Sequence, residues 1–134
     1  MADVVYADRT DFARFGVMAS ATLNVPDATI DAALASASAV LDTYFRARYS
    51  LPLLEWDTSI RQMCCWIAAW EVMTGRGFSA DAGRDEQIQT RYEKAIAWAE
   101  GVERQRVHPH VVETPKAAPA YQFPQVATNP KAGW

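Results

Sequence analysis

Apolar residues recur at alternating steps of four and three along one stretch of the chain. The repeating positions are Ile30, Leu34, Ala37, Leu41 and Tyr44, with Val40 and Phe45 widening the stripe. This spacing places them on one side of an α-helix, where they can pack against a second helix. We therefore predict a long helix over residues 28–48, with Asp27 as a cap for its first turn. Leu51 and Pro52 end the pattern, because proline disfavours the helical conformation in the residue before it.

Weaker patterns predict three more helices, at 10–15, 57–74 and 85–103. The first would be capped by Thr10 and closed by Gly16, and the second would be capped by Asp57 or Thr58. The inner stripe expected for the last helix is Ile88, Tyr92, Ala95, Ala99 and Val102. Residues 3–6 are expected to form an extended arm, and residues 49–56 a connector. The fold class that follows is all-α: a small four-helix bundle with one long central helix.

The pattern changes after Arg106. Five of the seven prolines fall in residues 108–134, and this density favours extended polyproline conformation and opposes helix. Apolar side chains are nevertheless spaced along the segment: Val111, Val112, Tyr121, Phe123, Val126 and Trp134. Extended segments with such side chains often dock on another surface. We therefore expect a helical domain, 1–103, followed by an extended proline-rich C-terminal arm, 104–134, that is ordered only when bound.

Length and charge narrow the classes of protein. At 134 residues the chain forms one domain with a modest core. Residues 1–103 carry 15 acidic and 9 basic side chains, whereas residues 104–134 carry 1 and 4. An acidic body argues against a general DNA-binding domain. The uneven charge suits a tail that reaches onto another protein, or a body that does not bind DNA passing close by. Ordinary scatter in composition explains the same counts.

The third predicted helix is apolar on every side from Met63 to Trp70. This run is far too short to span a membrane, and the opening residues lack a secretory signal, so we expect a cytoplasmic protein or one built into a particle assembled there. Either Trp66 or Trp70 helps to form a contact with a partner, or the flanking helices hide both of them. The adjacent cysteines, Cys64 and Cys65, are expected to be buried and reduced.

Few residues suggest catalysis. Glu71 is the one carboxylate expected on an apolar helix, and either a surface position or pairing with Arg48 or Arg61 explains it without chemistry. The two histidines, His108 and His110, flank a proline and have no further metal-ligating residues at a suitable spacing. The chain also has no glycine-rich phosphate loop. We therefore expect no enzymatic activity, no cofactor and no metal.

Four stretches carry a resemblance to a known family. They are DAAL at 31–34, ASAVLDTYF at 37–45, RYSLPL at 48–53 and RYEKAIAW at 91–98. The chain thereby resembles small Mu-like phage and prophage proteins from about residue 6 to residue 101. Those are similar to the head–tail connector, or adaptor, proteins of long-tailed phages and gene transfer agents. Two departures are the proline-rich tail and the bulky residues at 64–66 and 70.

The resemblance implies a structural role in the neck of a virion, after assembly in the host cytoplasm. Connectors form a ring, usually of twelve copies, beneath the portal. The ring joins the portal to a stopper or tail-terminator protein, and DNA passes through it without sequence-specific binding. The side chains expected at subunit or partner interfaces are Ala35, Ser36, Ala39, Trp66, Trp70, Tyr121, Phe123 and Trp134. Those expected to fix the corner after the long helix are Tyr44, Arg48, Tyr49 and Pro52.

A different class of function fits the same sequence: a helical regulatory or binding module of a mobile element that acts through its proline-rich tail. The assembly state separates the two, because a regulator is expected to stay monomeric or dimeric. A small hydrolase that uses Glu71 is a third and more distant hypothesis.

Overall fold

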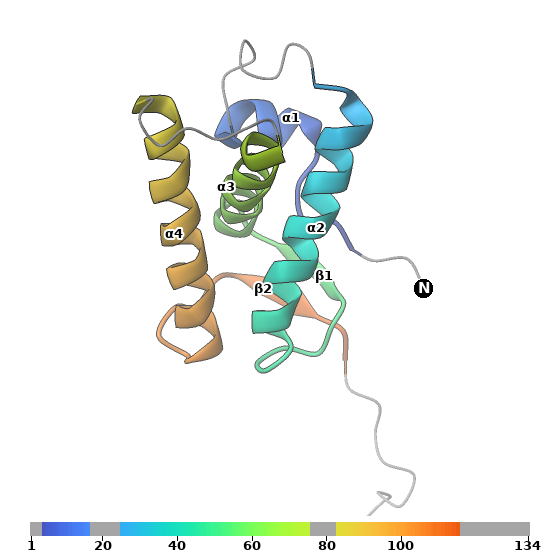
Figure 1. Ribbon diagram of the computed structural model, residues 1–134. Helices are drawn as coiled ribbons and strands as arrows, with labels where there is room; N and C mark the ends of the chain where they lie inside the picture. Colours follow the sequence, from blue (N-terminus) through green and yellow to red (C-terminus); the bar gives the residue numbers. More distant parts are fainter. Residues whose placement is uncertain (1–3, 17–24, 76–82, 116–134) are drawn as a thin grey trace, which may run out of the picture.

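The computed structural model describes residues 4–16, 25–75 and 83–115, and its main body is three long helices (Figure 1). These are α2 (Asp27–Phe45), α3 (Thr58–Gly75) and α4 (Gly83–Glu103), with α3 packed against both of the others. A single turn, α1 (Arg9–Asp11), continues as a π-helical turn, Phe12–Gly16, which packs on α3. The predicted mostly helical fold, with four helices packed together, is confirmed. No helix in the described ranges is both long enough and apolar enough to cross a bilayer.

The long helix follows its predicted stripe but differs at both ends. Ile30, Leu34, Ala37 and Leu41 of that stripe are buried, but at its end Phe45 is buried while Tyr44 is half-buried. The helix ends at Phe45 rather than near residue 48. The prediction that Asp27 caps the helix is wrong, because Pro26 is the N-cap and no side chain bonds there. The carboxylate of Asp27 instead lies 2.6 Å from the guanidinium of Arg9.

The core lies where α3 meets its neighbours. Its α3 members include Ile60, Cys64, Cys65, Ile67 and Ala68, and α4 adds Ile88, Ala95, Ala99 and Val102 as predicted. Both cysteines are free and buried. Burial raises the pKa of Cys64 to about 11 and also raises that of Cys65. Both thiols therefore remain protonated, and weakly reactive, near neutral pH.

A two-stranded antiparallel sheet lies at one end of the helices (Figure 1). Its strands are β1 (Leu53–Trp56) and β2 (Val111–Glu113), with Leu53 opposite Glu113 and Trp56 opposite Val111. β1 falls in the predicted connector and β2 in the predicted tail, so the sheet was missed. The described part of that tail, residues 104–115, therefore packs against the helical body and is not a separate arm.

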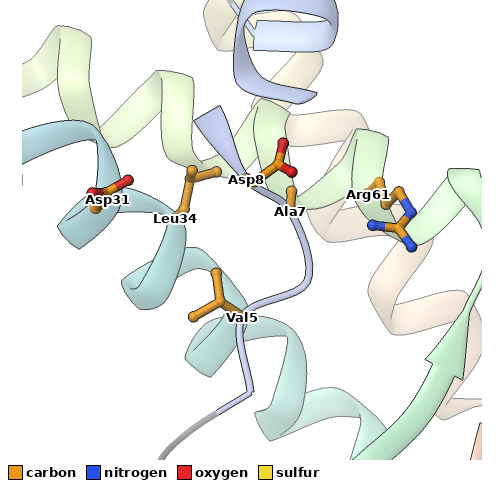
Figure 2. A pocket seen from close by; sticks show the side chains of 6 residues that line it. All are labelled: Val5, Ala7, Asp8, Asp31, Leu34 and Arg61. Atoms are coloured by element: carbon orange, nitrogen blue, oxygen red, sulfur yellow. The ribbon is translucent and has the colours of Figure 1, made fainter. Parts of the chain in front are cut away.

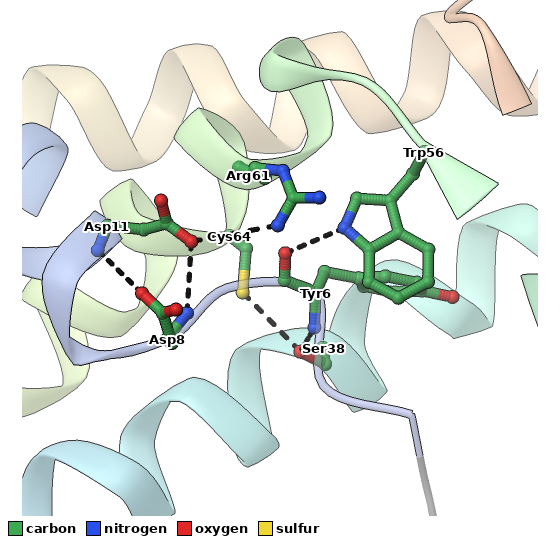
Figure 3. A network of polar contacts seen from close by, with 7 residues as sticks. All are labelled: Tyr6, Asp8, Asp11, Ser38, Trp56, Arg61 and Cys64. Atoms are coloured by element: carbon green, nitrogen blue, oxygen red, sulfur yellow. Dashed lines mark hydrogen bonds and ion pairs between the residues drawn. The ribbon is translucent and has the colours of Figure 1, made fainter. Parts of the chain in front are cut away.

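The segment before α1 is anchored in the core by Tyr6, which is fully buried. Figure 3 shows its polar contacts with Ser38 and Trp56. Its amide donates to the hydroxyl of Ser38 at 3.0 Å, and its carbonyl accepts from the indole of Trp56 at 2.8 Å. The phenol donates to Asp42, and its ring meets Phe45 and Trp56 edge-on at 5.8 and 4.9 Å. Burial, followed by the hydrogen bond to Asp42, raises the pKa of Tyr6. Two elements, α2 and β1, thus converge on a residue expected only to be part of an arm.

The end of α4 is closed by a Schellman motif. The amide of Arg106 donates to the carbonyl of Gly101 at 2.7 Å, and that of Gln105 donates to Val102 at 3.0 Å. Gln105 has φ of 64°, a left-handed conformation. The motif turns the chain so that Val107 lies against Gly101, where an added Cβ would come within 2.8 Å of the valine.

We expect Gln105→Gly to stabilise the protein by about 0.5–1 kcal/mol, because glycine adopts the left-handed conformation without the steric cost of a Cβ. Urea unfolding followed by circular dichroism measures this change. The matched control is Gln62→Gly inside α3, which should destabilise by about 1 kcal/mol. A loss of stability in Gln105→Gly would contradict the account of this turn.

The start of α3 is tied to β2 through Asp57. Its carboxylate accepts from the amide of Ile60 at 3.3 Å and the hydroxyl of Ser59 at 2.6 Å, which confirms it as a cap. The other oxygen accepts from the amide of His110 at 2.9 Å. Burial alone would raise the pKa of Asp57, but these hydrogen bonds outweigh it and lower the pKa.

A carboxylate whose pKa is lowered by folding stabilises the protein above its unfolded pKa, and that contribution is lost as the pH falls through the folded pKa. We expect Asp57→Asn to reduce the free energy of unfolding by about 1–2 kcal/mol at neutral pH, and by less under acid conditions where wild type has lost the same contribution. Urea unfolding at pH values above and below the pKa of Asp57 tests this. Glu93→Gln, on the exposed side of α4, should change stability little at either pH. An equal deficit for Asp57→Asn at both pH values would contradict the prediction.

Candidate assembly surfaces

Arg48 joins three parts of the fold just after α2. One guanidinium nitrogen, Nη1, donates to the carbonyls of Val102 at 3.2 Å and Val107 at 3.1 Å. The other, Nη2, lies 2.6 Å from Nδ1 of His108. Because a guanidinium only donates, the imidazole accepts at Nδ1 and carries its proton on Nε2. Arg48 thus ties the end of α2 to the end of α4 and to the chain that leads into β2.

The other three residues predicted at this corner, Tyr44, Tyr49 and Pro52, also lie there, and each makes a different kind of contact. Tyr49 packs edge-on against Phe45 at 5.9 Å, and the guanidinium of Arg48 lies 5.4 Å from its ring centroid. Burial raises the pKa of Tyr49. Pro52 follows a cis peptide bond, and its carbonyl accepts from the hydroxyl of Thr114. Tyr44 is half-buried against the core, and burial raises its pKa too.

A second constellation runs across three helices, and we call it the three-helix surface. Its members are Ser36 of α2, Trp66, Trp70 and Glu71 of α3, and Arg91 and Tyr92 of α4. The hydroxyl of Ser36 donates to Glu71 at 2.6 Å. On α4, the ring of Tyr92 stacks on Trp70 at 4.9 Å and 17°. The guanidinium of Arg91 lies 5.7 Å from the ring centroid of Trp66.

The structure thereby brings together three of the residues expected at interfaces: Ser36, Trp66 and Trp70. Ala35 and Ala39 are exposed on α2 beside Ser36, while Ala37 and Ser38 of the same small-residue stretch face the core. Both tryptophans are only half-buried, so flanking helices do not hide them completely. The other three expected interface residues, Tyr121, Phe123 and Trp134, lie outside the described residues.

Glu71 does not pair with Arg48 or Arg61, contrary to the expectation from sequence. Its Oε1 accepts from Ser36, and its Oε2 is buried with no hydrogen-bond partner among the described residues. Arg61 instead lies 3.8 Å from Asp11 and 5.6 Å from the ring centroid of Trp56.

Groups that could carry chemistry are otherwise dispersed over the described residues. His108 is held by Arg48, and the backbone of His110 is held by Asp57, so the two histidines serve different contacts. Across the described ranges, no three residues among His, Cys, Asp and Glu come together in a way that would hold a metal ion. The described surface does present exposed small side chains on α2 and half-buried aromatic side chains on α3 and α4.

The profile of a family described as "Bacteriophage Mu, Gp36" matches residues 6–128 of the chain. The chain belongs to the Mu Gp36 family. It is also 31% identical over 105 residues to "Gene product J" of Escherichia phage Mu, an alignment that covers 78% of this chain and 70% of that relative. The predicted resemblance to Mu-like phage proteins is thus confirmed at the level of the family.

The Gp36 match corrects one expectation about the tail. From the sequence, the proline-rich tail is expected to be a departure from the family. The match continues to residue 128, so it includes Tyr121, Phe123 and Val126. It also begins at Tyr6, the residue that anchors the N-terminal segment in the core.

Proposed function

We propose that this Gp36-family protein is a head–tail connector, or adaptor, of a tailed phage or phage-like particle. It would form a ring, with twelve copies as the expected number, beneath the portal. The ring would join the portal to a stopper or tail-terminator protein and would leave a channel for DNA. The role is structural and requires neither a cofactor nor catalysis. The observation that carries the proposal is the family match, because the Mu-like motifs in this chain resemble those of connectors.

The three-helix surface supports self-association. Half-buried aromatic and arginine side chains are the residues that most often anchor interfaces, and Trp66 with Arg91 supplies one such pair. The exposed alanines on α2 allow a second helix to approach closely.

Charge supports a channel that DNA passes through. Residues 1–103 carry a net charge of −6, from 15 acidic and 9 basic side chains. A negative wall repels the phosphate backbone, so DNA would move past it without being held.

The experiment that tests the proposal is negative-stain imaging of the purified protein, alone and mixed with portal rings from the same genome. Rings of this chain stacked on the narrow end of the portal are the expected result. Monomers or dimers that ignore the portal would overturn the connector proposal and favour the regulatory module. Binding of the chain to DNA in the absence of portal would argue against a channel that lets DNA pass freely.

A substitution on α2 tests the subunit interface separately. We expect Ala35→Arg to block ring formation, because a long charged side chain prevents close approach of another helix, while stability changes by less than about 0.5 kcal/mol at an exposed site. Sedimentation velocity in the presence of portal measures assembly, and urea unfolding measures stability. Ala97→Arg, exposed on α4, is the matched control and should still assemble. Full assembly of Ala35→Arg would place the interface elsewhere.

A further inference from the structure

Two shallow hollows meet at Arg61 on the side of the molecule where the N-terminal segment crosses α2 and α3. The first has a volume of about 360 Å³ and is shown in Figure 2; its lining is Val5, Ala7, Asp8, Asp31, Leu34 and Arg61. The second, of about 170 Å³, is lined by Leu54, Glu55, Trp56 and Arg61. We call the two together the Arg61 groove. None of its residues belongs to the three-helix surface.

Two large apolar side chains in the groove are exposed to solvent. Leu54 is 56% exposed and Val5 is 42% exposed, and these are the two most exposed large apolar residues in the described ranges. Leu54 faces outward because successive side chains of a strand point to opposite faces and Leu53 is buried. Apolar side chains gathered in a hollow are typical of a docking site.

The charge of the groove is negative. Three carboxylates line it, on Asp8, Asp31 and Glu55, against the single guanidinium of Arg61. Arg61 is turned toward Asp11 and the ring of Trp56. Arg9 lies 3.2 Å from Asp31, but it also lies 2.6 Å from a further carboxylate, Asp27. Five carboxylates thus surround two guanidiniums, so the groove favours an apolar chain that carries positive charge.

The chain itself contains such a segment. Residues 116–134 carry Lys116 and Lys131, no acidic side chain, and the aromatic residues Tyr121, Phe123 and Trp134. Fully extended, this length would reach roughly 60 Å at about 3.3 Å per residue. We propose that the Arg61 groove of one copy receives the C-terminal segment of a neighbouring copy, with aromatic side chains over Val5 and Leu54.

The direction of β2 favours a neighbouring copy over the same chain. β2 starts opposite Trp56 and ends opposite Leu53, and the amide of Thr114 then donates to the carbonyl of Ser50 at 3.0 Å. The chain therefore leaves the sheet heading away from Trp56 and the groove. A segment that served its own groove would have to turn back across β1. The inference rests on the self-association in the proposed function, but it does not require the portal.

Cysteine cross-linking of full-length protein tests the proposal. Leu54→Cys and Phe123→Cys are made in separate chains that carry different tags, mixed, and oxidised mildly with diamide. The native thiols do not compete, because Cys64 and Cys65 are buried and their pKa values are raised. We expect a disulfide-linked heterodimer in about tenfold excess over the one formed by Ala97→Cys with Phe123→Cys, because docking raises the local concentration only at the groove.

Charge reversal in the groove provides a second readout. Asp31→Lys combined with Glu55→Lys should reduce the yield of the Leu54–Phe123 cross-link several-fold at low salt, because the substitutions repel the basic segment. The matched control is Glu93→Lys combined with Glu100→Lys on the exposed side of α4, which should leave the yield unchanged. If charge reversal in the groove left the cross-link yield unchanged, the electrostatic part of the proposal would be overturned.

Other outcomes separate the failures. Equal cross-linking at positions 54 and 97, or none at either, would overturn the groove assignment. A single chain carrying both Leu54→Cys and Phe123→Cys that links only to itself on dilution would show that the segment serves its own groove. Portal-bound rings without the cross-link would overturn this inference and leave the connector proposal intact. A cross-link without portal-bound rings would overturn the connector proposal and leave this inference intact.

Discussion

Tyr6→Ala should cost more stability than any other single substitution considered for this protein, about 3–5 kcal/mol. The change removes a fully buried ring from contact with Phe45 and Trp56, and it takes away the hydroxyl that donates to Asp42. The cavity would open where the N-terminal segment, α2 and β1 meet. Urea unfolding measures the loss directly, and thermal unfolding should show a midpoint lower by roughly 10 °C.

Two variants show which part of Tyr6 matters. Tyr6→Phe keeps the ring and should cost only about 1 kcal/mol, the ordinary value of one hydrogen bond. Val5→Ala, at the exposed neighbouring position, should lie within about 0.5 kcal/mol of wild type. If Tyr6→Ala were no worse than Tyr6→Phe, the ring would not be part of the core and the N-terminal segment would be only loosely attached.

Arg48→Ala is the second large effect, with an expected loss of about 2–4 kcal/mol. The substitution removes the donor that the carbonyls of Val102 and Val107 share. Val102 still accepts from the amide of Gln105, whereas Val107 loses the donor described for it, and a partly buried acceptor left unpaired carries a desolvation cost. It also frees His108 and removes the cation from the ring of Tyr49. Since Arg48 spans α2, α4 and the approach to β2, the loss should appear as a single cooperative shift in the unfolding curve.

Lysine at the same position separates charge from shape. Arg48→Lys keeps the positive charge but has one nitrogen in place of a planar fork, so it should recover less than half of the loss. Arg46→Ala, two residues earlier and exposed, should change stability little. Complete rescue by lysine would mean that charge alone, rather than the geometry of the fork, holds the corner.

The sequence predicts helices well where periodicity decides them. The buried stripes of α2 and α4 could be predicted because their positions recur with the helical repeat. That repeat is visible in the local sequence without knowledge of distant contacts. The start of α3 was found for the same reason, since Asp57 caps amides within its own first turn. Asp27 does not cap α2 because the helix begins one residue earlier than predicted, with Pro26 at the N-cap, so Asp27 lies inside the first turn.

The parts that were missed depend on contacts between distant segments. β1 and β2 are short, and each is stabilised mainly by the other, so neither shows an alternating pattern that a sequence can reveal. Tyr6 sits in a segment without periodicity, and its role follows only once Ser38, Asp42 and Trp56 surround it. The expected interface residues that the structure describes are exposed or half-buried. Their positions along the chain could not reveal that Ser36 of α2 bonds to Glu71 of α3.

The fixed root of the C-terminal segment has a geometric consequence. Thr114 bonds to both Ser50 and Pro52, and Glu113 accepts from the amide of Ser50 at 2.8 Å, so Pro115 leaves every copy at the same place and in the same direction. In any closed assembly of identical copies, these departure points are related by the same rotation as the subunits. They form a circle of evenly spaced attachment points whose radius is set by the folded body. A partner with matching rotational symmetry would then meet all of the segments at once, and weak single contacts would add up to strong attachment.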